Sequence, residues 1–177
     1  MKTTQYLFSG FGGQGILFAG KFLAYKGLLE GKQVSWLPSY GPEMRGGTAS
    51  CSVIVSDGAV GSPIVSHPVV LIAMNLPSLD RYENSVNAGG LIFADSTLIG
   101  RKVVRDDVKA FYVPATRLAS ENGYPTLANM ILLGKILTEL GEFDPVSVEA
   151  ALAKVISAKH ADMKEVNLGA LRLGAEQ

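Results

Sequence analysis

Ser9-Gly10-Phe11-Gly12-Gly13-Gln14-Gly15 is the stretch that decides the fold of this chain. A short apolar run, Tyr6-Leu7-Phe8, precedes it, and a long apolar-periodic segment begins at Ile16. Three of its glycines have the spacing G-x-G-x-x-G between a predicted strand and a predicted helix. Glycines let the backbone turn tightly and let a ligand come close, and the next helix offers free N–H groups. The stretch therefore predicts a site for an anion or a polar partner group.

Strands and helices are predicted to alternate outward from this turn. The strands are expected at residues 5–9, 33–37, 48–56, 69–74, 91–95 and 110–113, and the helices at 14–30, 77–88, 115–121, 126–140 and 145–158. Several strands are solid apolar runs, which is typical of strands covered on both faces. The pattern predicts an α/β fold, a Rossmann-like doubly wound sheet with helices on both faces, in a single domain over residues 1–177.

Composition excludes several classes of protein. Sixteen basic residues offset sixteen acidic ones, so the chain lacks the positive charge of a nucleic-acid binder. Charged residues make up only 18% of the 177 residues, which favours a surface partly covered by partner subunits. No apolar run of about 18 residues is present and the N-terminus lacks a signal-peptide core, so no membrane span is predicted and cytoplasm is the expected compartment.

The residues that usually carry catalysis or bind metals are scattered. Cys51 is the only cysteine, so neither an intrachain disulfide nor a cysteine-ligated cluster is possible, and Cys51 is expected in the core. His67 and His160 have no companions at ligand spacing, which predicts no metal site. No G-x-S-x-G elbow presents a serine nucleophile. We assign no catalytic residue.

A dinucleotide is one possible ligand of the glycine turn. An NAD site normally places an acidic residue at the end of the second strand, where it holds the ribose hydroxyls. Here the second strand is followed by Pro38, and the nearest acid is Glu43, inside a loop. The sequence therefore argues against ordinary NAD binding.

A second dense segment is Tyr40-Gly41-Pro42-Glu43-Met44-Arg45-Gly46-Gly47. Its glycines and proline predict a loop over 38–47. Arg45 has the geometry to fork onto a phosphate or carboxylate, and Glu43 to hold Arg45 or reach a partner chain. The alternative is a tight connection with an internal Glu43–Arg45 pair. Because both this loop and the glycine turn follow strands, we expect them at the same carboxyl edge of the sheet.

Asn129 lies on the predicted helix 126–140. It is a candidate to face the glycine turn, although a capping role or exposure to solvent is equally compatible with the sequence.

Together these segments resemble the gamma subunit of 2-oxoacid:ferredoxin oxidoreductases. The resemblance depends on the glycine turn and on the segment 39–49, followed by Ser56-Asp57, Ser62-Pro63-Ile64, Leu71-Ile72-Ala73-Met74-Asn75, Gly89-Gly90, Val113-Pro114-Ala115-Thr116 and Ala128-Asn129-Met130. These motifs occur in family order over about residues 5–140.

The resemblance implies a component of an enzyme that decarboxylates a 2-oxoacid on thiamine diphosphate and transfers the acyl group to coenzyme A. It implies alpha and beta partners that hold thiamine diphosphate and Mg²⁺, a small ferredoxin-like delta partner with iron–sulfur clusters, and ferredoxin or flavodoxin as electron acceptor. This chain itself is expected to hold none of these cofactors and not to be catalytic alone.

Among substrates the resemblance favours 2-oxoglutarate, with pyruvate and branched-chain 2-oxoacids as alternatives. The glycine turn, the loop 40–47 and Asn129 are the expected cofactor-binding or subunit-interface residues. Two other functions stay open: a purely structural assembly module of the complex, and a free-standing Rossmann protein that binds NAD(P) or flavin.

Overall fold

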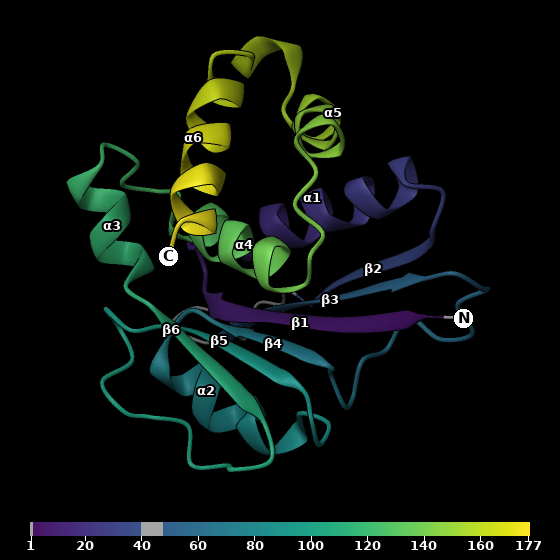
Figure 1. Cartoon of the computed structure of the whole chain (residues 1–177), viewed down its shortest axis with the longest axis vertical. Helices are drawn as coiled ribbons and strands as arrows, with labels where there is room; N and C mark the ends of the chain where they lie inside the picture. Colours follow the sequence, from purple (N-terminus) through teal and green to yellow (C-terminus); the bar gives the residue numbers. More distant parts are fainter. Residues whose placement is uncertain (1, 40–47) are drawn as a thin grey trace.

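A six-stranded sheet forms the middle layer of the computed structural model, which describes residues 2–39 and 48–177 (Figure 1). The strand order across the sheet is β2-β3-β1-β4-β5-β6. The strands are β1 (Thr3–Phe11), β2 (Gln33–Ser39), β3 (Thr48–Ser56), β4 (Val70–Ala73), β5 (Leu91–Asp95) and β6 (Lys109–Val113). The six predicted strands are thus confirmed, with small differences at their ends.

The sheet is mixed, because β3 runs antiparallel to both of its neighbours. Strands β1, β4, β5 and β6 are parallel to one another. A crossover to a parallel strand needs a dozen or more residues, and only residues 40–47 connect β2 to β3. Strand β3 therefore returns beside β2 and inserts between β2 and β1, an arrangement that the periodicity of its residues does not reveal.

Helices cover both faces of the sheet, as predicted (Figure 1). On one face lie α1 (Ile16–Leu29), α4 (Ala128–Glu139), α5 (Pro145–Val155) and α6 (Met163–Ala175), while α2 (Leu76–Tyr82) lies on the other. Alternate residues of a strand serve the two cores: Phe8 packs in the larger core with α1 and α4, and Leu7 packs in the smaller core with α2. This double burial explains the solid apolar runs of the central strands.

Several predicted boundaries require correction. The first helix begins at Ile16 rather than at residue 14, because the backbone of Gly15 is left-handed. The helix predicted over 77–88 ends at Tyr82, and a short 3-10 helix, Glu83–Ser85, follows it. The helices predicted over 126–140 and 145–158 are shorter, and α3 (Ala115–Glu121) matches its predicted range. Pro38 and Ser39, placed in the loop by sequence, belong to the edge strand β2.

The last helix, α6, is absent from the sequence-based prediction. It packs closely along α4, and a glycine from each helix lies at the contact. A Cβ atom on Gly134 would strike the carbonyl of Leu171, and one on Gly174 would strike the carbonyl of Ile131. In the described part of the chain, no helix has the length and apolar character needed to cross a membrane.

Candidate functional site

The glycine turn connects the end of β1 to the start of α1. Gly13 and Gly15 have positive φ angles of 91° and 73°, which L side chains rarely adopt. The N–H of Gln14 donates to the carbonyl of Phe11 at 3.2 Å and closes the turn. These two glycines are therefore required by the backbone path itself.

Gln14 fastens the turn to the neighbouring strand. Its Oε1 accepts the N–H of Phe11 at 2.6 Å, and its Nε2 donates to the carbonyl of Met74 at 3.1 Å, just beyond β4. Asn75 Nδ2 approaches the same Oε1 at 3.5 Å. A Cβ atom on Gly10 would lie 2.6 Å from Gln14 Oε1, so this glycine leaves room for the amide. Gln14 acts here as a clamp rather than as an exposed ligand.

Asn75 is a residue of this site that sequence reasoning missed. It is buried between β4 and α2, where its Oδ1 accepts the N–H of Ser78 at 2.9 Å and caps α2. Its Nδ2 is the group that reaches Gln14. An asparagine directly after a buried strand and before Pro77 is the signal that identifies it, because parallel strands end at the edge where ligands bind.

Asn129 faces the glycine turn from the first turn of α4. Its Nδ2 donates to the carbonyl of Gly15 at 3.0 Å, and only 4% of the residue is exposed. A Cβ atom on Gly15 would collide with this amide. Of the placements that the sequence left open, the structure therefore selects the one against the turn.

A pocket of about 290 Å³ opens on the turn. It is lined by Phe11, Gly12, Gly13, Gly15, Ile16, Leu17, Phe18 and Ala49. Among the described residues, no side chain caps the start of α1, and its first turn contains no acid. The first N–H groups of a helix and the positive end of its dipole favour an anion, so the pocket suits a phosphate or carboxylate.

The segment 40–47 lies outside the described residues, but the strands on either side of it are placed. Ser39 and Ser50 are paired across β2 and β3, and Thr48 is paired with Phe11 at the end of β1. The loop therefore begins and ends at the carboxyl edge that carries the glycine turn, as predicted from the strand order in the sequence.

Cys51 is fully buried in β3 and packs in the larger core. Burial raises the pKa of its thiol to about 12, so the thiol is protonated at neutral pH. The burial of Cys51 confirms its predicted place in the core.

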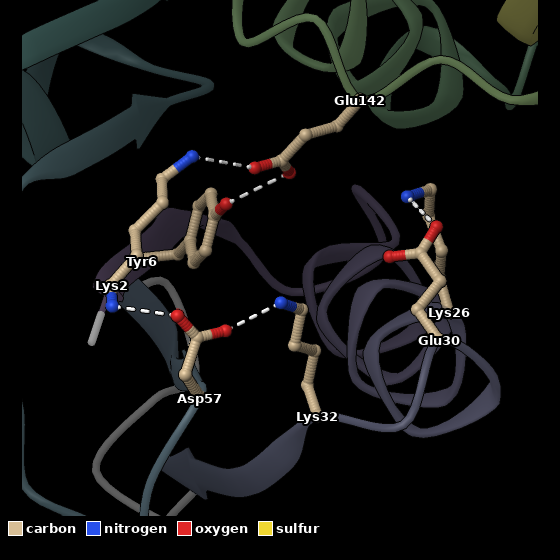
Figure 2. A network of polar contacts seen from close by, with 7 residues as sticks. All are labelled: Lys2, Tyr6, Lys26, Glu30, Lys32, Asp57 and Glu142. Atoms are coloured by element: carbon tan, nitrogen blue, oxygen red, sulfur yellow. Dashed lines mark hydrogen bonds and ion pairs between the residues drawn. The ribbon is translucent and has the colours of Figure 1, made fainter.

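The opposite, amino edge of the sheet carries a network of charges (Figure 2). Its members are Lys2, Tyr6, Lys26, Glu30, Lys32, Asp57 and Glu142. Glu142 accepts from Lys2 Nζ and from the Tyr6 hydroxyl, both at 3.3 Å. Burial and the Glu142 carboxylate raise the pKa of Tyr6, so its hydroxyl remains a donor.

The other two ion pairs of the network lie at the end of α1. Lys32 follows the helix and pairs with Asp57, directly after β3, and Lys26 on the helix pairs with Glu30 at its C-cap. Asp57 Oδ1 accepts from Lys32 Nζ at 2.5 Å, and Asp57 Oδ2 accepts the N–H of Lys2 at 2.7 Å. These bonds hold the pKa of Asp57 below its usual value. Lys26, whose side chain is 2% exposed, pairs with Glu30 at 2.5 Å. Every charge of the network thus has a partner within the chain.

The mixed sheet and the glycine turn at its carboxyl edge place the chain among α/β proteins of Rossmann-like architecture. Residues 5–177 match the family of pyruvate ferredoxin/flavodoxin oxidoreductases, and the chain belongs to this family.

Named relatives are 2-oxoacid oxidoreductase subunits. The 2-oxoglutarate synthase subunit KorC of Methanocaldococcus jannaschii is 35% identical over 171 residues, which cover 95% of this chain and 90% of KorC. The ketoisovalerate oxidoreductase subunit VorA of Methanothermobacter thermautotrophicus is 41% identical over 169 residues, or 95% of this chain. The chain spans only 35% of the length of VorA.

A solved structure gives the same result for the fold. The gamma subunit of a keto/oxoacid ferredoxin oxidoreductase from Geobacter sulfurreducens superposes with a TM-score of 0.82 at 28% identity, over 98% of this chain and 96% of that chain. The resemblance to gamma subunits that the sequence motifs indicated is confirmed.

Proposed function

We propose that this chain is the gamma subunit of a multisubunit 2-oxoacid:ferredoxin oxidoreductase, in which it supports the CoA-dependent oxidative decarboxylation of a 2-oxoacid. The observation that carries the proposal is the open pocket at the glycine turn, in a chain whose family and fold are those of gamma subunits. The lining that the structure describes offers backbone N–H groups to an anion and includes no acid, base or nucleophile that would perform the decarboxylation.

In this proposal the redox chemistry belongs to the partner subunits. Alpha and beta subunits hold thiamine diphosphate and Mg²⁺, which supply the decarboxylation, and a ferredoxin-like delta subunit holds iron–sulfur clusters that pass electrons to ferredoxin or flavodoxin. The single, buried cysteine of this chain supports the division of roles, because such clusters take four cysteine ligands.

The glycine turn and the loop 40–47 form one surface in this proposal. The N–H groups at the start of α1 receive a phosphate of coenzyme A or a polar group of a neighbouring subunit. Arg45 contributes the charge that the turn lacks, and Gln14 and Asn129 hold the turn in shape. The purely structural alternative keeps this surface as an interface that touches no ligand.

We propose 2-oxoglutarate as the substrate and ketoisovalerate as the main alternative. KorC relatives support the first, because they match this chain over nearly their whole length. VorA relatives support the second through their higher identity, although the chain covers a third of them.

The proposal is tested on the complex purified from its native source through a tag on this chain. We expect it to carry alpha and beta subunits and to reduce a viologen dye with 2-oxoglutarate fastest, at a rate that depends on coenzyme A. A preference of the complex for ketoisovalerate would identify ketoisovalerate as the substrate instead of 2-oxoglutarate. A chain that purifies alone or binds NAD(P) would contradict the proposal.

The same complex tests the surface through Arg45→Ala. Loss of the guanidinium should raise the coenzyme A concentration needed for half-maximal rate about tenfold or weaken subunit assembly. Arg81→Ala is the matched control, because Arg81 is exposed on α2, across the sheet from α1. Unchanged kinetics together with unchanged assembly would leave the loop without the proposed role.

A further inference from the structure

Strand β2 forms one edge of the sheet, and its composition is unusual for an edge strand. Among the described residues, no strand pairs with its outer side. It is seven residues long and contains no charged residue, and Trp36 and Leu37 are 38% and 39% exposed. Because side chains alternate along a strand, these two large apolar residues lie on opposite faces of the sheet. A long, uncharged and apolar edge of this kind is prone to pair with a further strand.

The opposite edge strand, β6, has the protection that β2 lacks. It is five residues long, and the exposed Lys109 at its start lies 3.6 Å from Glu139. Lys102 lies 3.8 Å from the centre of the Tyr112 ring. Short edge strands and lysines keep edges from pairing with other chains. The one comparable feature described in β2 is Pro38, which removes a single N–H from the strand.

Helix α1 extends the uncharged edge on one face of the sheet (Figure 1). Gly27 faces the strands, since a Cβ atom there would lie 3.0 Å from Val34 on β2 and 3.1 Å from Val55 on β3. Its two neighbours point about 100° to either side of it. Lys26 is 2% exposed and lies against the body of the protein, whereas Leu28 is 54% exposed. Leu28 therefore lies on the outer flank of α1, beside the edge that β2 forms.

We propose that this edge of β2 pairs with the same edge of a second copy of the chain about a two-fold axis, which joins the two six-stranded sheets into one. In such an interface each surface meets itself, so a charged edge sets like charges opposite each other, which destabilises a sheet. The uncharged β2 avoids this cost. The two α1 helices lie on the same face of the joined sheet, and Leu28 adds apolar surface to the contact. The inference does not rest on the proposed function.

The length of β2 sets the centre of the pairing at Trp36, the middle residue of Gln33–Ser39. In this register Trp36 meets its own copy, and Ser35 meets Leu37 of the second copy. Aromatic side chains directly opposite each other on one face of an antiparallel pair stabilise the pairing. Because the chain has a single tryptophan, the fluorescence of Trp36 reports on this interface directly.

Sedimentation velocity of the isolated full chain from about 1 to about 100 μM tests the inference. We expect the mass to rise from one chain to two over this range, and the Trp36 emission to shift to shorter wavelength in step, because pairing removes the ring from water. Leu37→Lys should raise the dissociation constant of the dimer at least about tenfold. Leu37 lies outside both hydrophobic cores, so this variant should still fold, which circular dichroism checks.

Three results would overturn the inference. The first is a chain that stays monomeric at every concentration, as expected if only a different subunit covers β2. The second is a dimer whose formation leaves the Trp36 emission unchanged, since its interface would lie elsewhere. The third is a dissociation constant that Leu37→Lys does not change.

Two neighbouring leucines of α1 separate this arrangement from general apolar association. Leu28 and Leu29 are 54% and 45% exposed, but Leu29 is turned about 100° further around the helix, away from the sheet. Leu28→Lys should raise the dissociation constant about tenfold, and Leu29→Lys, the matched control, should change it less than about twofold. Equal losses in the two variants would also overturn the inference.

Discussion

At its carboxyl end strand β1 runs into a turn of glycines held by neutral amides, whereas at its amino end it lies in a network of charges. At the carboxyl end, no side chain that the structure describes caps the first N–H groups of α1, and a pocket opens there. The amino end pairs Lys2 with Glu142 and Lys32 with Asp57. The charges of the amino edge are paired within the chain, whereas the carboxyl edge offers N–H groups to which an outside partner can bind.

The two edges differ in what their polar side chains hold in place. At the carboxyl edge the amides hold the backbone of a turn, and at the amino edge the charges mainly hold other side chains. The amides of Gln14 and Asn129 bind backbone atoms of the turn and its neighbour, so they determine where free N–H groups point. The ion pairs of the amino edge bind mainly other side chains, most of them partly exposed, and such pairs contribute little to stability. Substitutions of the amides at the carboxyl edge should therefore cost more than substitutions of the paired charges at the amino edge.

The largest expected effect compares the glycines that flank α1. Gly15 and Gly31 have nearly the same backbone, with φ angles of 73° and 75°, but a Cβ atom on Gly15 collides with Asn129 and one on Gly31 meets open space. Gly31→Ala should lower the free energy of unfolding by about 1 kcal/mol, the cost of the left-handed backbone. Gly15→Ala should lower it by about 2–4 kcal/mol, because overpacking is added. Urea unfolding of both variants measures the difference.

A double variant checks the cause of that difference. In Gly15→Ala/Asn129→Ala the smaller side chain should relieve the collision, so the two changes should cost less together than their separate sum, by more than about 0.5 kcal/mol. Equal losses in Gly15→Ala and Gly31→Ala, or additive losses in the double variant, would show that the Asn129 contact does not distinguish the two ends of α1.

An intermediate effect is expected from removing one side chain at each edge. Gln14→Leu loses the bonds to the Phe11 N–H and the Met74 carbonyl and should lower the free energy of unfolding by about 1–3 kcal/mol. Glu142→Gln removes a full charge but keeps an oxygen for the Tyr6 hydroxyl, and it should cost less than about 1 kcal/mol. Chemical denaturation ranks the two, and a costlier Glu142→Gln would reverse the comparison.

Local patterns were sufficient for much of the fold. Residues 48–56 and 91–95 were predicted with the boundaries that the structure has, because alternation or a solid apolar run is carried by consecutive residues, and the helix 115–121 also has its predicted bounds. The direction of β3 was not predictable from its own residues, since it follows from the length of the connection before it.

Helix α6 shows where such patterns fail. Gly169 and Gly174 lie within it and lower its intrinsic helix propensity. The same Gly174 lets α6 approach α4 closely, so the stability of the helix depends on a neighbour more than 30 residues away in sequence. A prediction from local sequence includes the low helix propensity of Gly174 but not the close packing against α4 that Gly174 permits.

The candidate site also has a part that the sequence predicts and a part that only the fold reveals. The glycine turn could be predicted from spacing, whereas the contact of Asn129 with the turn was only one of the placements that the sequence left open. The clamp between Gln14 and the Met74 carbonyl joins residues 60 positions apart, so only the fold reveals it. A cavity lined by residues of α4, α5 and α6 likewise requires three helices to come together and has no local signature.

The smallest expected effect is the pH dependence of the amino edge. The Lys32 ammonium and the Lys2 N–H lower the pKa of Asp57 from its usual value of 3.8. A carboxyl group whose pKa is lower in the folded chain contributes stability above its unfolded pKa and loses it as the pH falls through its folded pKa. Below about pH 4 the unfolding temperature should therefore fall slightly more steeply in the wild type than in Asp57→Asn. Gln14→Leu, which removes no titratable group, should keep the wild-type slope.

Thermal melts from pH 7 to 3 at low salt measure the three slopes, and added salt should bring them together because the Asp57 pair is partly exposed. Parallel curves for wild type and Asp57→Asn would mean that this pair adds nothing, and that the amino edge is held by its buried strands alone.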